Sequence, residues 1–213
     1  MVTTAYHHRH RFRLHSFLPY LSKYLSLDII DMPPLSYDKG EEEALSKFLL
    51  RVVREALANP VKVVKAGSVD VYTLRSLFPG DFGVLASTPM LSILLRKLKY
   101  RSYHAILATP FLAGFLALAS RRFLGNTPII YEDVDRFYDF FRNPLTRSLA
   151  KAFEYMVLRN TDAVIAASPY LYIEDNDLRE GKSTYFVPNG IEYRKFRETA
   201  KRIKKRNKYT MVY

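Results

Sequence analysis

The stretch PIIYEDVDRFYDFFRNPLTRSLAKAFEYMVLRNTDAVIAAS, residues 128–168, decides the fold class of this 213-residue chain. It holds a short apolar run at 128–131, an amphipathic segment at 144–159 and a second apolar run at 163–167. Short apolar runs of this kind predict buried strands, and the longer segment between them predicts a helix. Strand, helix and strand in this order imply a crossover connection and therefore a parallel sheet.

The same alternation extends outward in both directions. We expect further strands at 1–5, 27–31, 105–108 and 185–187, and further helices at 11–24, 41–58, 85–98 and 111–123. Two more strand candidates lie at Val61–Ala66 and Val69–Leu74, of which one is open to interpretation as a loop. The fold class that follows is α/β, a Rossmann-like parallel sheet with helices on both faces. We expect residues 1–197 to form this domain and 198–213 to form a basic linker and the start of a further domain.

Composition narrows the functional classes. The chain has no cysteine, which excludes a disulfide framework and any cysteine-ligated metal centre and fits a cytoplasmic setting. Of the net charge of +12, most comes from nine Lys/Arg and a single acid between Arg194 and Lys208. Because the rest of the chain is close to neutral, the charge favours local anion contacts over a nucleic-acid interface. The longest uncharged apolar run, 105–120, is shorter than the roughly 20 residues of a membrane-spanning helix.

Several common active-site motifs are absent from the sequence, among them G-x-G-x-x-G, the P-loop, G-x-S-x-G and H-E-x-x-H. The cluster His7-His8-x-His10 invites a metal interpretation. No nearby carboxylate or cysteine completes such a ligand set. The plainer interpretation is a basic loop in which Arg9 and Arg11 face a phosphate or a sugar.

Polar residues follow three of the predicted strands. Glu132 and Asp135 follow the strand at 128–131, Ser168 follows the strand at 163–167, and Asn189-Gly190 follows the last strand. Parallel sheets bind ligands at the carboxyl ends of their strands, and a carboxylate there can accept hydrogen bonds from hydroxyl groups. The alternative for the acids is a turn that caps the next segment. The Asn-Gly turn by itself indicates no function.

Taken in order, these pieces resemble the N-terminal domain of family 4 glycosyltransferases, which have the GT-B fold. The resemblance extends over about the whole chain and rests on four segments: Tyr131-Glu132-Asp133-Val134-Asp135, Glu154 on the following helix, Thr161-Asp162-Ala163-Val164-Ile165-Ala166-Ala167-Ser168, and Val187-Pro188-Asn189-Gly190-Ile191-Glu192-Tyr193-Arg194-Lys195-Phe196. No one segment is specific, but the ordered set at this spacing is.

The resemblance implies a hexosyltransferase-like enzyme that moves a sugar from a nucleotide-sugar donor to a sugar or lipid-linked acceptor, with retention at the anomeric carbon. It implies no cofactor and no metal. His7, Arg9, Glu132 and Asp135 would border the acceptor, and Ser168, Asn189 and Gly190 would lie near the donor. The absence of cysteine predicts a cytoplasmic protein, and the basic tail and N-terminal loop are compatible with a peripheral contact at the inner membrane face.

Two departures from the family pattern bear on activity. Tyr6-His7-His8 stands where the family has Gly-Gly, and no E-x₇-E pair occurs in the sequence. We therefore expect the paired glutamates in a C-terminal partner domain and no transfer by this chain alone. The competing hypothesis is a non-catalytic module that binds an anionic surface, membrane or nucleic acid, through the basic tail and the loop around Arg9.

Overall fold

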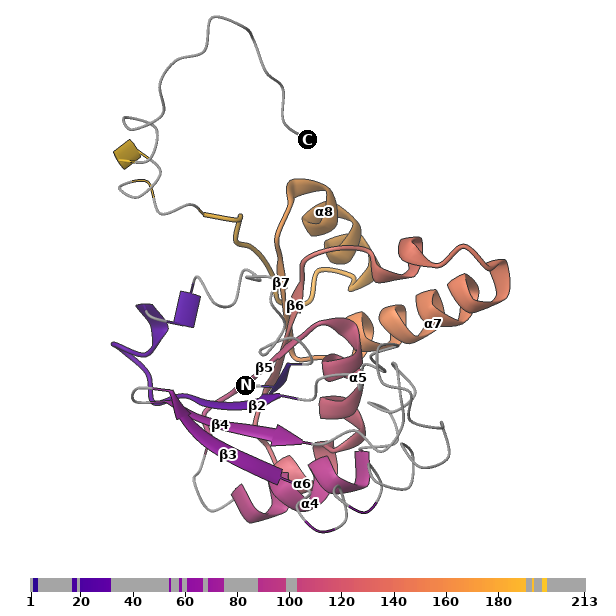
Figure 1. The fold of residues 1–213 in the computed structure, drawn as a ribbon. Coiled ribbons are helices and arrows are strands. Elements are labelled where there is room, and N and C mark those ends of the chain that lie inside the picture. The colour runs from indigo at the N-terminus through magenta and orange to yellow at the C-terminus, as the bar shows by residue number, and fades with distance from the viewer. Residues whose placement is uncertain are drawn as a thin grey trace, which may run out of the picture.

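A computed structural model describes residues 2–3, 17–18, 20–31, 54, 58, 61–66, 69–74, 88–98, 103–190, 193 and 197–198. Within these residues, strands form one eight-stranded sheet in the order β3-β4-β2-β1-β5-β6-β7-β8 (Figure 1). Their bounds are β1 Val2–Thr3, β2 Asp28–Asp31, β3 Val61–Ala66, β4 Val69–Leu74, β5 Ile106–Thr109, β6 Ile129–Asp133, β7 Ala163–Ala166 and β8 Thr184–Phe186.

The sheet is parallel from β4 to β8, as the strand–helix alternation predicts. The exception is β3, which pairs antiparallel with β4 at the edge of the sheet, from Val61 opposite Leu74 to Ala66 opposite Val69. Both candidate segments are therefore strands, and the interpretation of one as a loop is wrong. An antiparallel pair needs only a short connection, and only residues 67–68 separate these strands.

The described helices are α4 Thr88–Leu98, α5 Phe111–Ala119, α6 Arg121–Leu124, α7 Pro144–Asn160 and α8 Pro169–Leu178, with a 3₁₀ helix, η2, at Phe137–Phe140. The helix expected at 111–123 is interrupted at Ser120, which is buried and whose hydroxyl lies 3.3 Å from that of Ser92 on α4. The sequence analysis did not predict α8 or η2. Of the helices expected at 11–24 and 41–58, the structure describes only 17–18, 20–24, Arg54 and Ala58, and residues 17–18, 20–21, 54 and 58 are helical.

Local capping explains where α7 and α8 begin. The Asn143 side chain accepts hydrogen bonds from the backbone N–H groups of Leu145 and Thr146, at 2.9 and 3.2 Å, and Pro144 occupies the first helical position. Ser168 caps α8 in the same way through Leu171 N–H, at 3.2 Å. Such caps satisfy donors that have no partner inside the helix.

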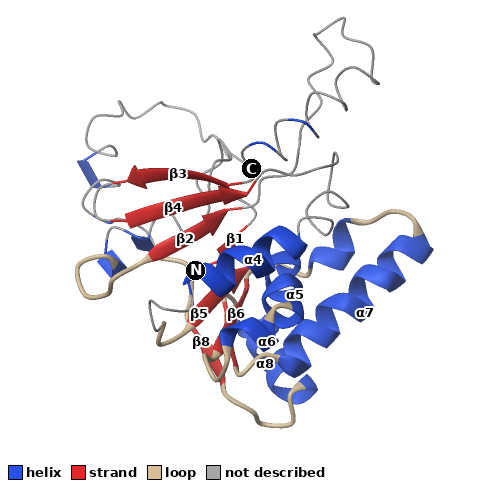
Figure 2. Ribbon diagram, turned by 90° about the horizontal axis from the view of Figure 1, so that it is seen from below, coloured by secondary structure: helices blue, strands red, loops and turns tan. Residues whose placement is uncertain are grey.

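Both faces of the sheet are covered, as the fold class requires. Ile30 and Tyr72 point into the larger core, which includes apolar residues of α4, α5 and α7. Their neighbours Ile29 and Val71 point to the other face and pack with Leu18. Figure 2 shows α4, α5 and α7 together on one side of the strands. The α/β Rossmann-like prediction is confirmed.

Close packing fixes α5 between the sheet and α7. A Cβ atom at Gly114 of α5 would lie 2.6 Å from Val157 Cγ1 on α7 and 3.1 Å from the Tyr131 ring on β6. Only glycine permits this approach, because both neighbours are fully buried side chains with little freedom to move. The helix layer is thereby held rigidly against β6, the strand that carries Glu132 and leads to Asp135.

Candidate functional site at the carboxyl edge of the sheet

The strand order places a switch point between β1 and β5. From β1 the chain builds β2, β3 and β4 on one side, and it then returns to the other side of β1 to build β5 through β8. Ligands of open α/β sheets bind outside the carboxyl ends of the strands near such a point. The helices α5 and α8 directly follow β5 and β7, so they begin at this edge.

Four of the sequence-predicted residues follow the carboxyl ends of three adjacent strands. Asp135 follows β6, Ser168 follows β7, and Asn189-Gly190 follow β8. The pairing continues past the strands themselves, since Ala167 N–H donates to Asp133 O at 2.9 Å and Val187 N–H donates to Ala166 O at 3.0 Å. Segments far apart in the sequence are thus held side by side. Their assignment to substrate binding stays a prediction.

The exposure of these residues differs. Asp135, Asn189 and Gly190 are exposed, whereas Ser168 is half-buried and its hydroxyl caps α8. Glu132 is only 4 % exposed, and its neighbour in the ladder is Ile165 on β7. Asp135 is therefore the member of the predicted acidic pair that presents its carboxylate to solvent. His7 and Arg9 lie outside the described residues.

Beneath this edge, a buried arginine gathers carboxylates from three elements. Arg136 lies just after β6 and forms an ion pair with Asp133, three residues before it. Its Nη2 donates to Asp175 Oδ1 on α8 at 2.7 Å, and its Nε donates to Glu174 Oε2 at 2.9 Å. Glu154 Oε1 on α7 lies 3.8 Å from Arg136 Nη1. We call Asp133, Arg136, Glu154, Glu174 and Asp175 the Arg136 cluster.

The Arg136 cluster holds more acids than its one guanidinium can neutralise. Asp133, Glu154 and Asp175 are all fully buried, and Glu174 is partly exposed. Burial raises the pKa of Asp133 to about 9, with a further contribution from Asp175 that Arg136 opposes. Burial also raises the pKa of Glu154 to about 7, against the opposing charge of Arg136, and raises the pKa of Asp175. The cluster therefore retains a proton at neutral pH.

The hydrogen bonding of the acids agrees with a retained proton. One buried oxygen each of Asp133, Glu154 and Asp175 lacks a hydrogen-bond donor among the described residues. Asp133 and Asp175 lie close enough to form a side-chain hydrogen bond when one of them is protonated. The other oxygen of Glu154 accepts from the backbone N–H of Tyr138, at 3.3 Å. The cluster thus ties β6, η2, α7 and α8 together beneath the candidate site.

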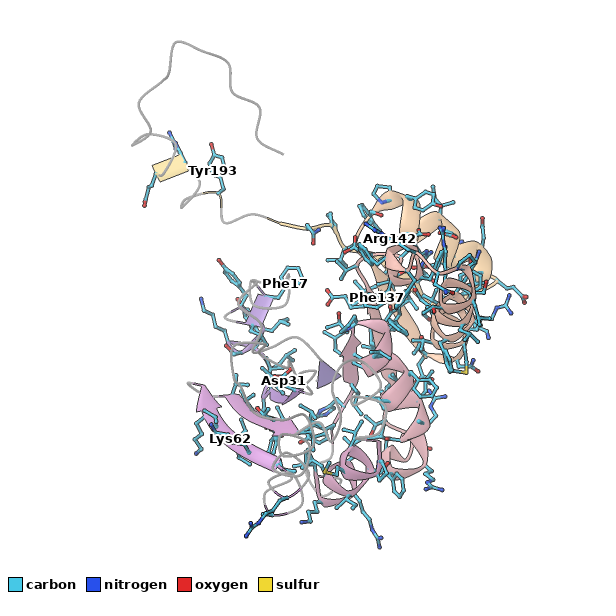
Figure 3. All side chains as sticks on the ribbon, turned by 45° about the vertical axis from the view of Figure 1, so that its right-hand side comes forward. Phe17, Asp31, Lys62, Phe137, Arg142 and Tyr193 are labelled. Atoms are coloured by element: carbon cyan, nitrogen blue, oxygen red, sulfur yellow. The ribbon has the colours of Figure 1, made fainter. Side chains whose placement is uncertain are left out.

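Aromatic rings border the same edge. Phe137 in η2 lies 4.8 Å, centroid to centroid, from Phe111 at the start of α5. Its ring is 5.8 Å from those of both Phe140 and Phe141. Figure 3 shows Phe137 and Arg142 on the side of the molecule that carries η2 and α7, and Asp31 among the N-terminal strands. Offset and tilted rings of this kind present an apolar surface beside the polar strand ends.

The sequence analysis named neither the Arg136 cluster nor the phenylalanines. The sequence did contain an indication of the Arg136 cluster, because Asp133 and Arg136 are three residues apart and directly follow a predicted buried strand. The contribution of Glu174 and Asp175 had no local signal, because they lie on a helix that was not predicted. In the described part of the chain, no group of three or more His, Asp or Glu side chains is arranged so that it could hold a metal ion. No described helix has the length and apolar character needed to cross a membrane.

Comparison with known proteins finds likenesses among solved structures. No family model matches the chain, and no curated protein matches it. Among solved structures, the chain is similar to a sucrose-phosphate synthase from Thermosynechococcus elongatus, with a TM-score of 0.49 and 16 % sequence identity over 89 % of each chain. A likeness at this identity and score says nothing about the activity of the present chain.

Proposed function

We propose that this chain is the acceptor-side domain of a retaining glycosyltransferase that uses a nucleotide-sugar donor. The observation that carries the proposal is the convergence of the ordered sequence segments at one edge of the sheet. Segments ending in Asp135, Ser168 and Asn189-Gly190 follow β6, β7 and β8, which are neighbours in the sheet. Their order in the sequence is what resembles family 4 glycosyltransferases, and their shared edge is where an α/β sheet binds ligands.

The chemistry of this edge suits a sugar. The exposed carboxylate of Asp135 can accept hydrogen bonds from two sugar hydroxyls. Phe137 and Phe140 offer an apolar surface to the C–H face of a pyranose ring. The N-termini of α5 and α8 lie at the same edge, and helix N-termini favour the negative charge of a leaving diphosphate.

The described residues supply one wall of such a site. Retaining transfer needs the donor and the acceptor to be held together, and this positioning supplies much of the rate. We propose that the donor-binding groups, including a glutamate pair that the present sequence lacks, come from a second domain. The proposed role of this chain is to bind and orient the acceptor.

Nuclear magnetic resonance titration tests the location of the site. The ¹⁵N-labelled chain is titrated with a panel of mono- and disaccharides and with UDP- and GDP-sugars at millimolar concentration. We expect the amide signals of Asp135, Ser168 and Gly190 to shift together. Asp135→Asn should weaken the shifts, whereas Asp177→Asn should not, because this equally exposed carboxylate lies near the far end of α8. Shifts confined to other surfaces, or none with any ligand of the panel, would contradict the proposal.

A transfer assay tests the need for a second domain. The isolated chain is incubated with labelled nucleotide sugars and candidate acceptors, and product formation is followed. We expect binding of acceptor without turnover, because the donor diphosphate lacks most of its contacts. Turnover by the isolated chain would show that these residues suffice, and the two-domain part of the proposal would then be wrong.

A further inference from the structure

The outer face of α7 is apolar although it is exposed. Leu145 is 71 % exposed and Leu149 is 54 % exposed, and Phe153 and Met156 are also exposed. These residues follow one another at intervals of four, four and three, so they form one stripe along the helix. Phe140, just before the helix, extends the stripe and is 68 % exposed. Exposed apolar residues are common singly, but a contiguous row of five marks a contact surface.

Basic residues lie at both ends of this stripe. The sole acid of α7 is Glu154, which is buried in the Arg136 cluster. Arg142 precedes the helix and Arg159 lies in its last turn, and both are exposed. Arg147 and Lys151 are two residues away from stripe positions and so lie on the opposite side of the helix, where Arg147 pairs with Asp139 and Lys151 lies over the rings of Tyr138 and Tyr155. The stripe is therefore apolar along its length and cationic at its two ends.

The position of α7 leaves this face accessible. In Figures 1 and 2 the helix lies at the outer margin of the helix layer, with α5 between it and the strands. The exposure of the stripe shows that no described element of the chain covers it. The chain passes from β6 through η2 into α7, so the Phe140–Leu145 end lies on the same side as the carboxyl edge of the sheet.

We propose that the outer face of α7 docks on an anionic phospholipid bilayer. A helix with an apolar stripe and cations at its ends binds such a surface by burying its apolar side chains at the acyl boundary, while the cations contact lipid phosphates. A second copy of the chain fits less well. In a twofold interface the same face meets itself, so the cations of one copy would approach those of the other. This docking surface is separate from the basic tail, shares Phe140 with the proposed sugar site, and does not depend on the proposed function.

A tryptophan reporter tests insertion directly, because the protein contains no tryptophan. Leu145→Trp places an indole on the stripe. Ile93→Trp places one on α4, where Ile93 is 58 % exposed. Vesicles of phosphatidylcholine with about 30 % phosphatidylglycerol should shift the emission of the first variant to shorter wavelength and leave the second unchanged. Vesicles of phosphatidylcholine alone should have a smaller effect on both.

Vesicle flotation tests whether the stripe supplies affinity. The double variant Leu145→Ser, Leu149→Ser should partition at least about tenfold less onto the anionic vesicles than the parent, because it removes two exposed apolar side chains without touching the core. The matched control is Val63→Ser, Ile93→Ser, which removes two equally exposed apolar side chains from β3 and α4 and should bind as the parent does. Circular dichroism confirms that all variants are folded.

Three results would overturn the proposal. One is binding that persists in the Leu145→Ser, Leu149→Ser variant and disappears when Lys201–Lys208 are neutralised, which would assign the surface to the tail. Another is absence of vesicle binding together with a dimer that the same variant dissociates in analytical ultracentrifugation, which would make the face an interface between copies. The third is equal emission shifts for Leu145→Trp and Ile93→Trp.

Discussion

Among the described residues, two arginines are buried, and different groups stabilise their charges. Arg136 lies beneath the carboxyl edge of the sheet and contacts four carboxylates. Arg179, just after α8, contacts backbone carbonyls instead. Its guanidinium donates to Leu158 O, to Thr161 O at 3.1 Å and to Asp162 O at 3.3 Å, and also to the Thr161 hydroxyl at 3.3 Å.

The two environments affect the pKa of the buried arginine in opposite directions. The carbonyls around Arg179 belong to the end of α7 and the turn after it, where the helix dipole is negative. They do not titrate, and burial lowers the pKa of Arg179 in spite of Asp175 and Asp162. At Arg136, burial also disfavours the charge, but Asp133, Asp175 and Glu174 hold its pKa above the ordinary range. Because acids titrate, the stability contributed by the Arg136 cluster depends on pH. Because carbonyls do not titrate, the stability contributed by Arg179 does not.

The largest effect is expected from removing the cation of the cluster. Arg136→Met leaves three buried carboxyls without a counter-charge, and it should lower the free energy of unfolding by about 3–5 kcal/mol. The loss should be larger at pH 8 than at pH 5, because the acids can take up protons at the lower pH. Urea unfolding measures it, with the exposed Arg142→Met as control. A loss no larger than that of the control would show that the acids are neutral without Arg136.

The next effect concerns the pH dependence of stability. Since the pKa of Asp133 rises from 3.8 to about 9 on folding, the native state binds its proton more tightly than the unfolded state. The resulting stabilisation is complete below about pH 3.8 and is lost as the pH rises through about 9. Glu154 acts in the same direction up to about pH 7.

Between pH 5 and pH 8, the free energy of unfolding should therefore fall by up to about 1.4 kcal/mol per pH unit from Asp133 alone. Asp133→Asn should flatten this slope, because the amide cannot titrate. The neighbouring Asp135→Asn, at an exposed site, should leave the slope as it is. The measurement is urea unfolding at four pH values. Equal slopes for all three proteins would mean that Asp133 is ionised in the folded state.

A smaller and pH-independent loss is expected at the second arginine. Arg179→Met leaves the carbonyls of Leu158, Thr161 and Asp162 without this donor, and it should cost about 2 kcal/mol. Because no acid depends on Arg179 for its main counter-charge, the loss at pH 5 and at pH 8 should agree. If the loss in the free energy of unfolding grew with pH, as expected for Arg136→Met, then the two buried arginines would not differ in pH dependence.

The smallest effect is expected at an exposed arginine, with which the losses at the two buried arginines can be compared. Arg121 pairs with Asp162, and both side chains are more than a third exposed. Arg121→Gln should cost less than about 1 kcal/mol, because water already solvates both charges. High salt should reduce the difference further. Thermal unfolding at low and high ionic strength checks this expectation, and a salt-independent loss would point to packing of the arginine stem instead.

Local sequence was enough to predict most of the elements. The strands β5, β6 and β7 and the helices α4 and α7 lie within a few residues of their expected positions, because apolar periodicity and capping residues act over one or two turns. The same reasoning missed α8. Its residues Pro169–Leu178 include Glu174, Asp175 and Asp177 and show little amphipathic pattern, since the buried Asp175 takes the place of an apolar residue. With an acid at its inward position, α8 lacks the apolar periodicity from which a helix is predicted.

For the candidate site, sequence alone determined which segments follow strands, because the ends of apolar runs can be recognised locally. It could not determine which acid of Glu132, Asp133 and Asp135 is exposed. Because side chains alternate along a strand, Glu132 and Asp133 point to opposite faces of the sheet. How deeply each is buried depends on the elements that pack against that face. Asp133 is held by Arg136 and Asp175, and Asp175 comes from a helix far along the chain. Only the tertiary structure could bring these charges together, because a buried acid is tolerated where a counter-charge balances it and a partner shares its proton, and the partner Asp175 comes from a distant helix.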